Sequence, residues 1–214
     1  MRPAQVLACV GLAACTAGGP RPGGDGPRDS TTPAESSPGP IAIGPDAATT
    51  DVSSVVGKPA PEWELATWFN AKPLTMADLR GRVVLVRWFM SSECPYCSAT
   101  APSLVKLDAD YAARGLTVVG MYHHKSDGPL VVEDVRKLVQ ERYAFRFPVA
   151  IDDDWKTLKR WWLDAHPESW TSVSFLVDRG GTVRFVHLGG EYAPDSGDYR
   201  QMRAWIEELL AAPR

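Results

Sequence analysis

The chain has 214 residues, of which 44% are hydrophobic and 23% are charged. That length fits one domain of ordinary size together with a tail, and the apolar fraction is sufficient for a core. A formal net charge of −3 offers no basic surface of the kind that nucleic acid requires, so we exclude nucleic-acid partners. The chain also lacks the run of about 18 apolar residues that a membrane-spanning helix needs.

The first residues resemble an export signal. Arg2 supplies a positive charge, and residues 6–14 form a short apolar stretch. The end of that stretch, LAAC, resembles a bacterial lipobox, in which the cysteine becomes the lipidated first residue of the mature protein. We therefore predict a signal peptide over residues 1–15 and a lipid anchor on Cys15. A plain secretory signal cut elsewhere, or an unprocessed tail, is the alternative.

Residues 16–50 are rich in Gly, Pro, Ser, Thr and Ala and have almost no large apolar side chains. Such a segment cannot bury enough surface to offset the entropy of ordering it, so we predict a disordered tether. The globular domain is predicted over residues 51–214. A tether of this kind holds a soluble domain away from a membrane. We therefore expect an exported protein at the periplasmic or cell-envelope face of a bacterial membrane, bound there by its lipid.

The predicted elements of the domain are strands and helices in alternation. Apolar alternation predicts a half-buried strand over residues 62–65, and Thr75 and Asp78 predict a helix cap before a turn that ends at Gly81. The further strands are predicted at 83–89, 116–121, 147–151, 173–177 and 182–188, and the further helices at 95–114, 132–143, 155–162 and 199–210.

The order of these elements predicts an α/β fold with a central mixed sheet flanked by helices. The strand–helix–strand unit over residues 83–121 implies two parallel strands. The last two strands are joined by the sequence DRGG, which favours an antiparallel hairpin at the end of the sheet. We therefore predict a thioredoxin-like fold with an N-terminal strand extension and a helical insertion between its halves.

Cys94 and Cys97 are the most informative residues of the domain. They form the sequence CPYC between the strand 83–89 and the helix 95–114. Two cysteines at this spacing can close and reopen a small disulfide ring, and a C-x-x-C pair in this context is typical of a redox motif. Unpaired N–H groups and the dipole at the start of the helix favour a thiolate at Cys94, which is the reactive species. The domain has no other cysteines for a disulfide framework, so we interpret the pair as catalytic.

Several stretches around this pair are shared with a known family. They are GKPAP at 57–61, LRGRVVLV at 79–86, CPYC at 94–97, PSL at 102–104, RGLTVVG at 114–120 and FLVDRGGTVR at 175–184. Together they resemble the TlpA/ResA-like thiol–disulfide oxidoreductases, from about residue 57 to the C-terminus. The resemblance implies an exported, membrane-tethered protein with a thioredoxin fold that moves electrons to or from protein disulfides outside the cytoplasm.

The resemblance also implies roles for single residues. Cys94 corresponds to the exposed attacking cysteine of the family, and Cys97 corresponds to the resolving cysteine. Pro102 corresponds to a proline that kinks the active-site helix, because it removes one helical hydrogen bond. Pro95 and Tyr96 complete the environment of the two sulfurs. The expected partners are protein disulfides or dithiols and an upstream electron donor, whose identity the sequence does not reveal; no cofactor or metal is expected.

The sequence departs from the family's pattern at two positions. Ser172 stands where most of the family has a cis-proline, six residues before Asp178, in a loop that packs beside the cysteines. We expect Thr171 and Ser172 to face the substrate, and the serine to widen or repolarise the groove. Glu93 stands directly before Cys94, where the family usually has tryptophan. A carboxylate pointed at the sulfur would disfavour the thiolate, whereas one that faces solvent would do little.

Two other functions remain open at this point. A peroxiredoxin-like peroxidase would need a proline and a threonine shortly before the attacking cysteine, and residues 90–93 supply neither. A copper-binding chaperone on a thioredoxin fold would combine both cysteines with a histidine, His123, His124 or His187, but the usual pattern there has three residues between the cysteines. We interpret His123 and His124 as solvated loop residues and His187 as a packed or surface residue.

Two further groups have ordinary explanations. The tryptophans between residues 155 and 170 are interpreted as core and groove-lining residues, and Trp170 could contact a substrate because it adjoins the loop at 171–172. The acidic run at 152–154 is interpreted as a solvated helix-capping loop. A calcium site would need a repeated pattern of oxygen ligands that is missing here.

Overall fold

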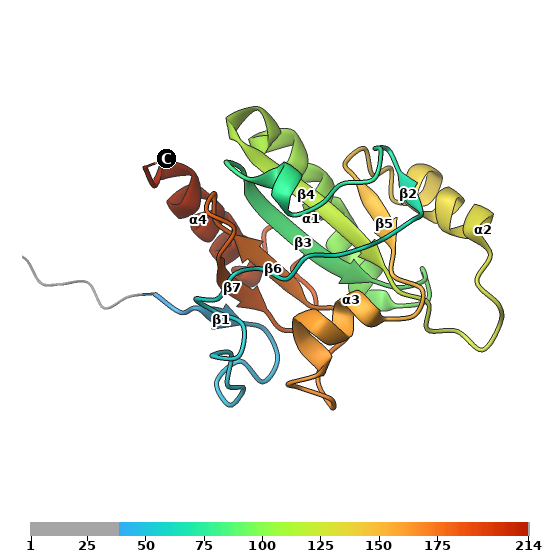
Figure 1. Ribbon diagram of the computed structural model, residues 1–214, viewed down its shortest axis with the longest axis horizontal. Helices are drawn as coiled ribbons and strands as arrows, with labels where there is room; N and C mark the ends of the chain where they lie inside the picture. The colour runs from blue at the N-terminus through green and yellow to red at the C-terminus, as the bar shows by residue number, and fades with distance from the viewer. Residues whose placement is uncertain (1–38, 214) are drawn as a thin grey trace, which may run out of the picture. The chain divides into compact units, whose positions relative to one another are not determined.

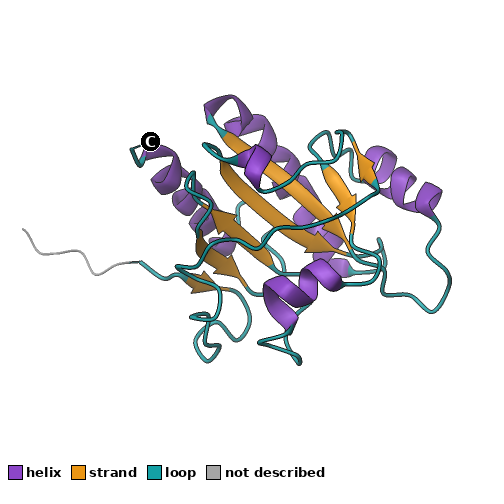
Figure 2. Ribbon diagram, viewed as in Figure 1, coloured by secondary structure: helices purple, strands orange, loops and turns teal. Residues whose placement is uncertain are grey.

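The computed structural model describes residues 39–213 (Figures 1 and 2). The predicted signal peptide, Cys15 and residues 16–38 of the predicted tether lie outside the described residues. The strands are β1 (Ala42–Ile43), β2 (Trp68–Phe69), β3 (Val83–Phe89), β4 (Leu116–Tyr122), β5 (Val149–Ile151), β6 (Ser174–Val177) and β7 (Val183–His187). The helices are α1 (Pro95–Tyr111), α2 (Val132–Lys137), α3 (Lys156–Leu158) and α4 (Gly197–Ala211). Short 3-10 turns lie at Ala77–Leu79 and Ala112–Arg114, and π-helical turns extend α2 and α3 over Leu138–Arg142 and Lys159–Leu163.

The seven strands form one mixed sheet in the order β1-β7-β6-β3-β4-β5-β2. β3, β4 and β5 are parallel neighbours, with Leu85 opposite Val118, and β6 and β7 add the antiparallel hairpin beside β3. α2 and β5 lie between β4 and α3 in the chain, as the inserted segment (Figure 1). The predicted thioredoxin-like fold with a helical insertion is therefore confirmed.

Both faces of the sheet are covered. Every residue of β3 is buried, because its alternate side chains enter two separate cores. Leu85 and Phe89 pack with residues of α1, α2 and α4, whereas Val86 and Trp88 pack with residues of α3 (Figure 2). This packing places the end of β3 and the start of α1 at the edge of the sheet where β4 also ends. Within residues 39–213 no helix combines the length and the apolar character needed to cross a membrane.

The N-terminal part of the domain differs from the prediction at residues 39–50. We expected a tether up to residue 50, but the compact unit begins at Gly39, and β1 pairs with β7 in parallel, Ala42 opposite Val186. The backbone N–H of Leu188 donates to the carbonyl of Ile43 at 2.8 Å, and the Trp205 indole donates to the carbonyl of Pro40 at 3.0 Å. The amino-acid composition does not predict that this segment is ordered, because backbone hydrogen bonds to a sheet edge hold it rather than large apolar side chains.

The predicted strand at 62–65 is also wrong. Trp63 is buried and its neighbours are exposed, as the alternation implied, but the segment makes no ladder with the sheet. Its indole donates to the carbonyl of Leu74 and stacks on Trp161 with ring centroids 5.9 Å apart. The strand of the N-terminal extension is instead β2, which pairs antiparallel with β5. The predicted cap before the short 3-10 turn is confirmed, since Thr75 and Asp78 exchange backbone-to-side-chain hydrogen bonds.

Candidate functional site

Cys94 lies at the N-cap of α1, at the point where the loop after β3 turns into the helix. Its backbone is extended, with φ −75° and ψ 108°, and Pro95 occupies the first helical position. The backbone N–H of Cys97 donates to the sulfur of Cys94 at 3.3 Å. The thiol of Cys94 is partly exposed. The first turn of the helix therefore aims an N–H group at a sulfur that solvent and a substrate can reach.

Cys97 lies one turn further along α1 and is only 3% exposed. Its sulfur is 2.6 Å from that of Cys94, and its thiol donates toward it. Burial raises the pKa of the Cys97 thiol to about 12, and the hydrogen bond to Cys94 acts in the same direction. The two cysteines are therefore unequal, because one is accessible and the other is a protonated thiol held behind it.

The burial of Cys97 has a measurable consequence for the reduced protein. A thiol whose folded pKa is raised from 9.0 to about 12 stabilises the fold fully below about pH 9 and loses that contribution as the pH rises toward 12. We expect urea unfolding of the reduced protein to show a loss of about 2.5 kcal/mol between about pH 8 and pH 11 that a Cys97→Ala variant does not show. Equal pH slopes in the two proteins would contradict the burial of this thiol.

A groove of about 370 Å³ runs beside Cys94. The loop before β6 forms one wall, and two rings of the lining, those of Trp170 and Tyr96, contact each other edge to face with centroids 6.1 Å apart. Asp46, from the segment after β1, accepts a hydrogen bond from the Trp170 indole at 3.3 Å. The lining residues are Asp46, Met90, Cys94, Tyr96, Lys125, Glu168, Ser169, Trp170, Thr171 and Ser172. Sequence reasoning missed Asp46, because it lies in the segment expected to be a tether.

The structure brings Thr171 and Ser172 to the groove that Cys94 lines. Ser172 is 5% exposed, and the adjoining carbonyl of Val173 accepts from the Trp88 N–H of β3 at 3.0 Å. This hydrogen bond joins the loop to β3, the strand that precedes the cysteine pair, and so holds the loop beside the Cys94 sulfur.

Glu93 and Pro102, the two other residues predicted to influence the cysteine pair, lie on either side of it in the chain. Glu93 is exposed to solvent. Pro102 lies inside α1, where its missing N–H leaves the carbonyl of Ser98 without a helical donor. The hydroxyl of the same serine donates to the carbonyl of Ser92, in the loop before the cysteines, at 3.1 Å.

The histidines after β4 occupy two different environments. His123 is fully buried with its ring edge to face on Trp155, and neither ring nitrogen has a partner among the described residues. Burial, with the nearby charges of Lys125 and Arg87, lowers the pKa of His123 to about 3, so the ring is neutral. His124 is partly exposed, and its Nε2 lies 2.7 Å from the carbonyl of Gly128. The interpretation of two solvated loop histidines is therefore wrong for His123, because the loop folds back under Trp155.

His187 is packed in the core, and its Nε2 lies 3.0 Å from a carboxylate oxygen of Asp198. Within residues 39–213 no cluster of three or more His, Cys, Asp or Glu side chains is arranged to hold a metal ion. A copper site that combines the two cysteines with a histidine therefore has no support in this part of the chain.

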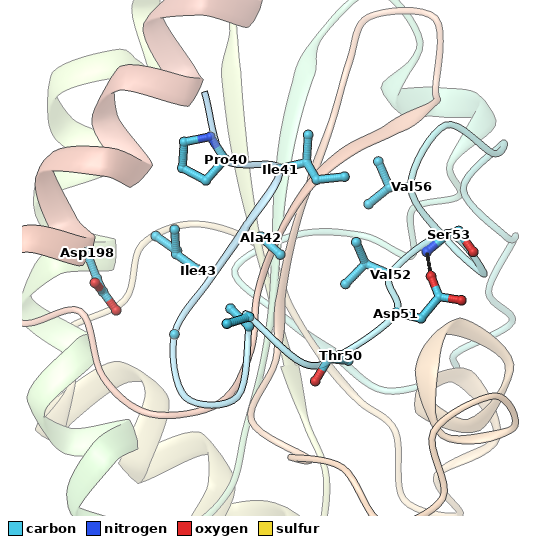
Figure 3. A pocket seen from close by; sticks show the side chains of 13 residues that line it. Pro40, Ile41, Ala42, Ile43, Thr50, Asp51, Val52, Ser53, Val56 and Asp198 are labelled. Carbon is cyan, nitrogen blue, oxygen red and sulfur yellow. Dashed lines mark hydrogen bonds between the residues drawn. The ribbon is translucent and has the colours of Figure 1, made fainter. Parts of the chain in front are cut away.

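A larger cavity, of about 900 Å³, lies away from the cysteine pair (Figure 3). The segment from Pro40 to Val56 forms most of its wall, with Asp198 on the opposite side. Asp51, one of the lining residues, accepts a hydrogen bond on its carboxylate from the Ser53 N–H at 2.8 Å. No cysteine or histidine lies in its lining, whereas the smaller groove contains Cys94.

Comparisons with known proteins agree with this geometry. The model of the AhpC/TSA family matches residues 56–186, more than half of the chain. The protein DipZ of Mycobacterium tuberculosis (strain CDC 1551 / Oshkosh) is 28% identical over 146 residues, which are 67% of this chain and 19% of DipZ. The thiol-disulfide oxidoreductase ResA of Bacillus anthracis is 27% identical over 128 residues, 60% of this chain and 66% of ResA. The match thus spans about a fifth of DipZ and about two thirds of ResA.

Among solved structures, a thiol:disulfide interchange protein of the thioredoxin family from Chlorobium tepidum TLS superposes on the chain with a TM-score of 0.55. The two are 19% identical, and the match covers 73% of this chain and 97% of the other. At this level of identity the likeness establishes the fold.

Proposed function

The chain belongs to the AhpC/TSA family, and from that premise we propose that it is a thiol–disulfide oxidoreductase that reduces protein disulfides through Cys94 and Cys97. The observation that carries the proposal is the inequality of the two sulfurs. Cys94 is partly exposed and caps a helix, and Cys97 is buried 2.6 Å behind it. An accessible nucleophile with a second thiol held within reach is the arrangement that two-step disulfide exchange requires.

The reaction follows from this arrangement. The Cys94 thiolate attacks a substrate disulfide, forms a mixed disulfide, and expels one substrate thiolate. The Cys97 sulfur then attacks the Cys94 sulfur, the bond between Cys94 and the substrate breaks, and the second substrate thiolate leaves. Two electrons pass from the protein to the substrate, and an upstream donor must reduce the pair again.

The groove beside Cys94 supports an extended polypeptide as the substrate. Its walls combine aromatic rings, at Trp170 and Tyr96, with the polar loop at Thr171 and Ser172, so both apolar and backbone groups of a chain find contacts. Ser172 takes the place where relatives of the TlpA/ResA type usually have proline, and we propose that it shapes this wall.

We further propose that the domain works outside the cytoplasm, on the periplasmic or cell-envelope face of a bacterial membrane, with a lipid anchor on Cys15. The export signal and lipobox predicted at the N-terminus support this location. Cell fractionation is expected to find the wild-type chain with the membranes and a Cys15→Ala variant in the soluble extracytoplasmic fraction. Recovery of both proteins in the same fraction would refute the anchor.

Insulin reduction tests the proposed activity. Wild-type protein with dithiothreitol as donor should accelerate the precipitation of insulin chains, and equilibration with glutathione should yield a reduction potential for the pair. The same preparation should leave hydrogen peroxide unconsumed, because residues 90–93 provide no proline or threonine to orient a peroxide. Rapid peroxide consumption without insulin reduction would favour a peroxiredoxin-like peroxidase instead.

A further inference from the structure

Arg87 is a fully buried arginine in the middle of the sheet, and the proposed reaction does not use it. It lies on β3, whose sequence is VVLVRWF, and the six remaining residues of that strand are all apolar. Its Nη1 donates to the Ser174 hydroxyl at 3.2 Å and its Nη2 to the carbonyl of Gly190 at 3.1 Å. Both acceptors are neutral, and Nε has no partner among the described residues. A buried charge without a counter-ion is strongly disfavoured unless something nearby balances it.

The charge of this guanidinium acts on four titratable side chains, each from a different segment of the chain. Tyr192, from the loop after β7, places its ring 5.4 Å from Cζ of Arg87. The positive charge of Arg87 also acts on His123, directly after β4, on His187 of β7 and on Cys97 of α1. The carboxylate of Asp198, on α4, is hydrogen-bonded to His187 and partly exposed.

Of these four side chains, only a thiol or a phenol can become negative, since an imidazole cannot. Tyr192 is fully buried and shares a hydrogen bond with Ser174, and burial raises the pKa of its phenol. Cys97, in contrast, has to lose its proton in every catalytic cycle if the proposed function holds. The resolving thiol is therefore the group whose negative form can balance Arg87.

The site of Arg87 is joined to the first turns of α1. The N–H of Tyr192 donates to the Thr100 hydroxyl at 3.4 Å, and that hydroxyl donates to the carbonyl of Tyr96 at 2.8 Å. Thr100 lies one turn after Cys97, and Cys97 and Tyr192 belong to one apolar cluster. Tyr192 thus links Arg87 to the first turns of α1, which hold the resolving sulfur, and the charge of Arg87 opposes the effect of burial on the Cys97 pKa.

We propose that Arg87 is a positioning residue whose buried positive charge stabilises the Cys97 thiolate during the second step of disulfide exchange. This inference rests on the proposed function. In that step Cys97 gives up its proton, its sulfur bonds to the Cys94 sulfur, and the bond between Cys94 and the substrate breaks. The departing substrate thiolate takes up the proton, so charge and electrons balance. Arg87 acts on this step and leaves the first attack, by the partly exposed Cys94, unaffected.

The two steps can be timed separately with 5,5′-dithiobis(2-nitrobenzoate). Attack by Cys94 releases one coloured nitrothiobenzoate, and resolution by Cys97 releases the second. We expect Arg87→Gln to slow the second release by roughly tenfold near neutral pH, which is the effect of one pKa unit on the thiolate fraction, and to shift the pH profile of that release upward. The first release should stay within about twofold of wild type, and Arg87→Lys should restore the second release.

Two further variants keep the test decisive if Arg87→Gln does not fold. Ser174→Asp places a carboxylate against the guanidinium and cancels its charge, so it should slow the second release, whereas Ser174→Asn should not. Arg82→Gln is a matched control, because Arg82 lies at the opposite end of β3 and bonds to Thr117 and Ala112. It should change neither release.

The outcomes separate this inference from the proposed function. An unchanged second release in folded Arg87→Gln, or equal rates in the Asp and Asn variants at position 174, would overturn the role of Arg87 alone. A wild-type protein that releases no nitrothiobenzoate and reduces no insulin would overturn the proposed function itself.

Discussion

A Cys94→Ser variant is expected to reduce insulin no faster than dithiothreitol alone. Cys94 is the partly exposed sulfur at the start of α1, and Cys97 is only 3% exposed, with its pKa raised to about 12. The remaining thiol is therefore out of reach of a protein disulfide and almost entirely protonated near neutral pH. The insulin assay measures this loss. Substantial turnover in Cys94→Ser would refute the assignment of Cys94 as the attacking residue.

The matched Cys97→Ser variant should fail at the following step. Its Cys94 thiolate still attacks, but no second sulfur lies behind it, so the mixed disulfide accumulates. Non-reducing electrophoresis of the variant with an oxidised protein substrate should reveal a covalent complex that dithiothreitol cleaves by reducing the mixed disulfide. The Cys94→Ser variant should form no such complex. Equal trapping by both variants would mean that either sulfur can attack, which the burial of Cys97 contradicts.

The second large effect is expected at Asp152, which is fully buried at the end of β5. Its carboxylate accepts from the Trp88 indole at 3.1 Å and from the backbone N–H groups of Thr157 and Leu158 at 3.1 and 2.8 Å. It thereby joins β3 to the start of α3. Asp152→Ala leaves three buried donors without an acceptor, and we expect the free energy of unfolding to fall by about 3 to 5 kcal/mol in urea titrations.

The neighbouring Asp153 is the control for this change. It has the same side chain one residue later, but it is exposed. Asp153→Ala should alter the free energy of unfolding by no more than about 0.5 kcal/mol. If Asp152→Ala were equally mild, the three hydrogen bonds would not contribute to the fold as inferred.

For the acidic run at 152–154, the sequence predicts the capping hydrogen bonds but not the burial of each side chain. Its capping role is confirmed, since Asp152 accepts from the first N–H groups of α3, and Asp154 also accepts from Lys156. The prediction that the run is solvated is confirmed for Asp153 and Asp154 but wrong for Asp152, which has no exposed surface. A local pattern predicts which backbone groups need a partner, but burial depends on what packs above them, and Trp88 arrives from a strand more than sixty residues earlier in the chain.

Arg87 and His123 differ in how much of their surroundings the sequence can predict. Arg87 interrupts an otherwise apolar strand. Because such a strand is buried, the sequence already indicates that this arginine is buried too and needs polar partners. Which thiol, ring or carbonyl surrounds it depends on α1, β6 and the loop after β7, and these meet only in the folded chain. His123 follows β4 as a loop residue would, and it is buried because Trp155 folds over it.

The sequence by itself determined the order of strands and helices from β3 onward, the thioredoxin-like fold and the prominence of Cys94 and Cys97. These follow from apolar periodicity and from the spacing of two cysteines at a helix start, which are local along the chain. Only the tertiary structure decided that residues 39–50 join the domain, that Asp46 reaches the groove, and that the Cys94 sulfur is accessible while the Cys97 sulfur is buried. Those properties depend on contacts between segments far apart in the chain, which periodicity and spacing do not encode.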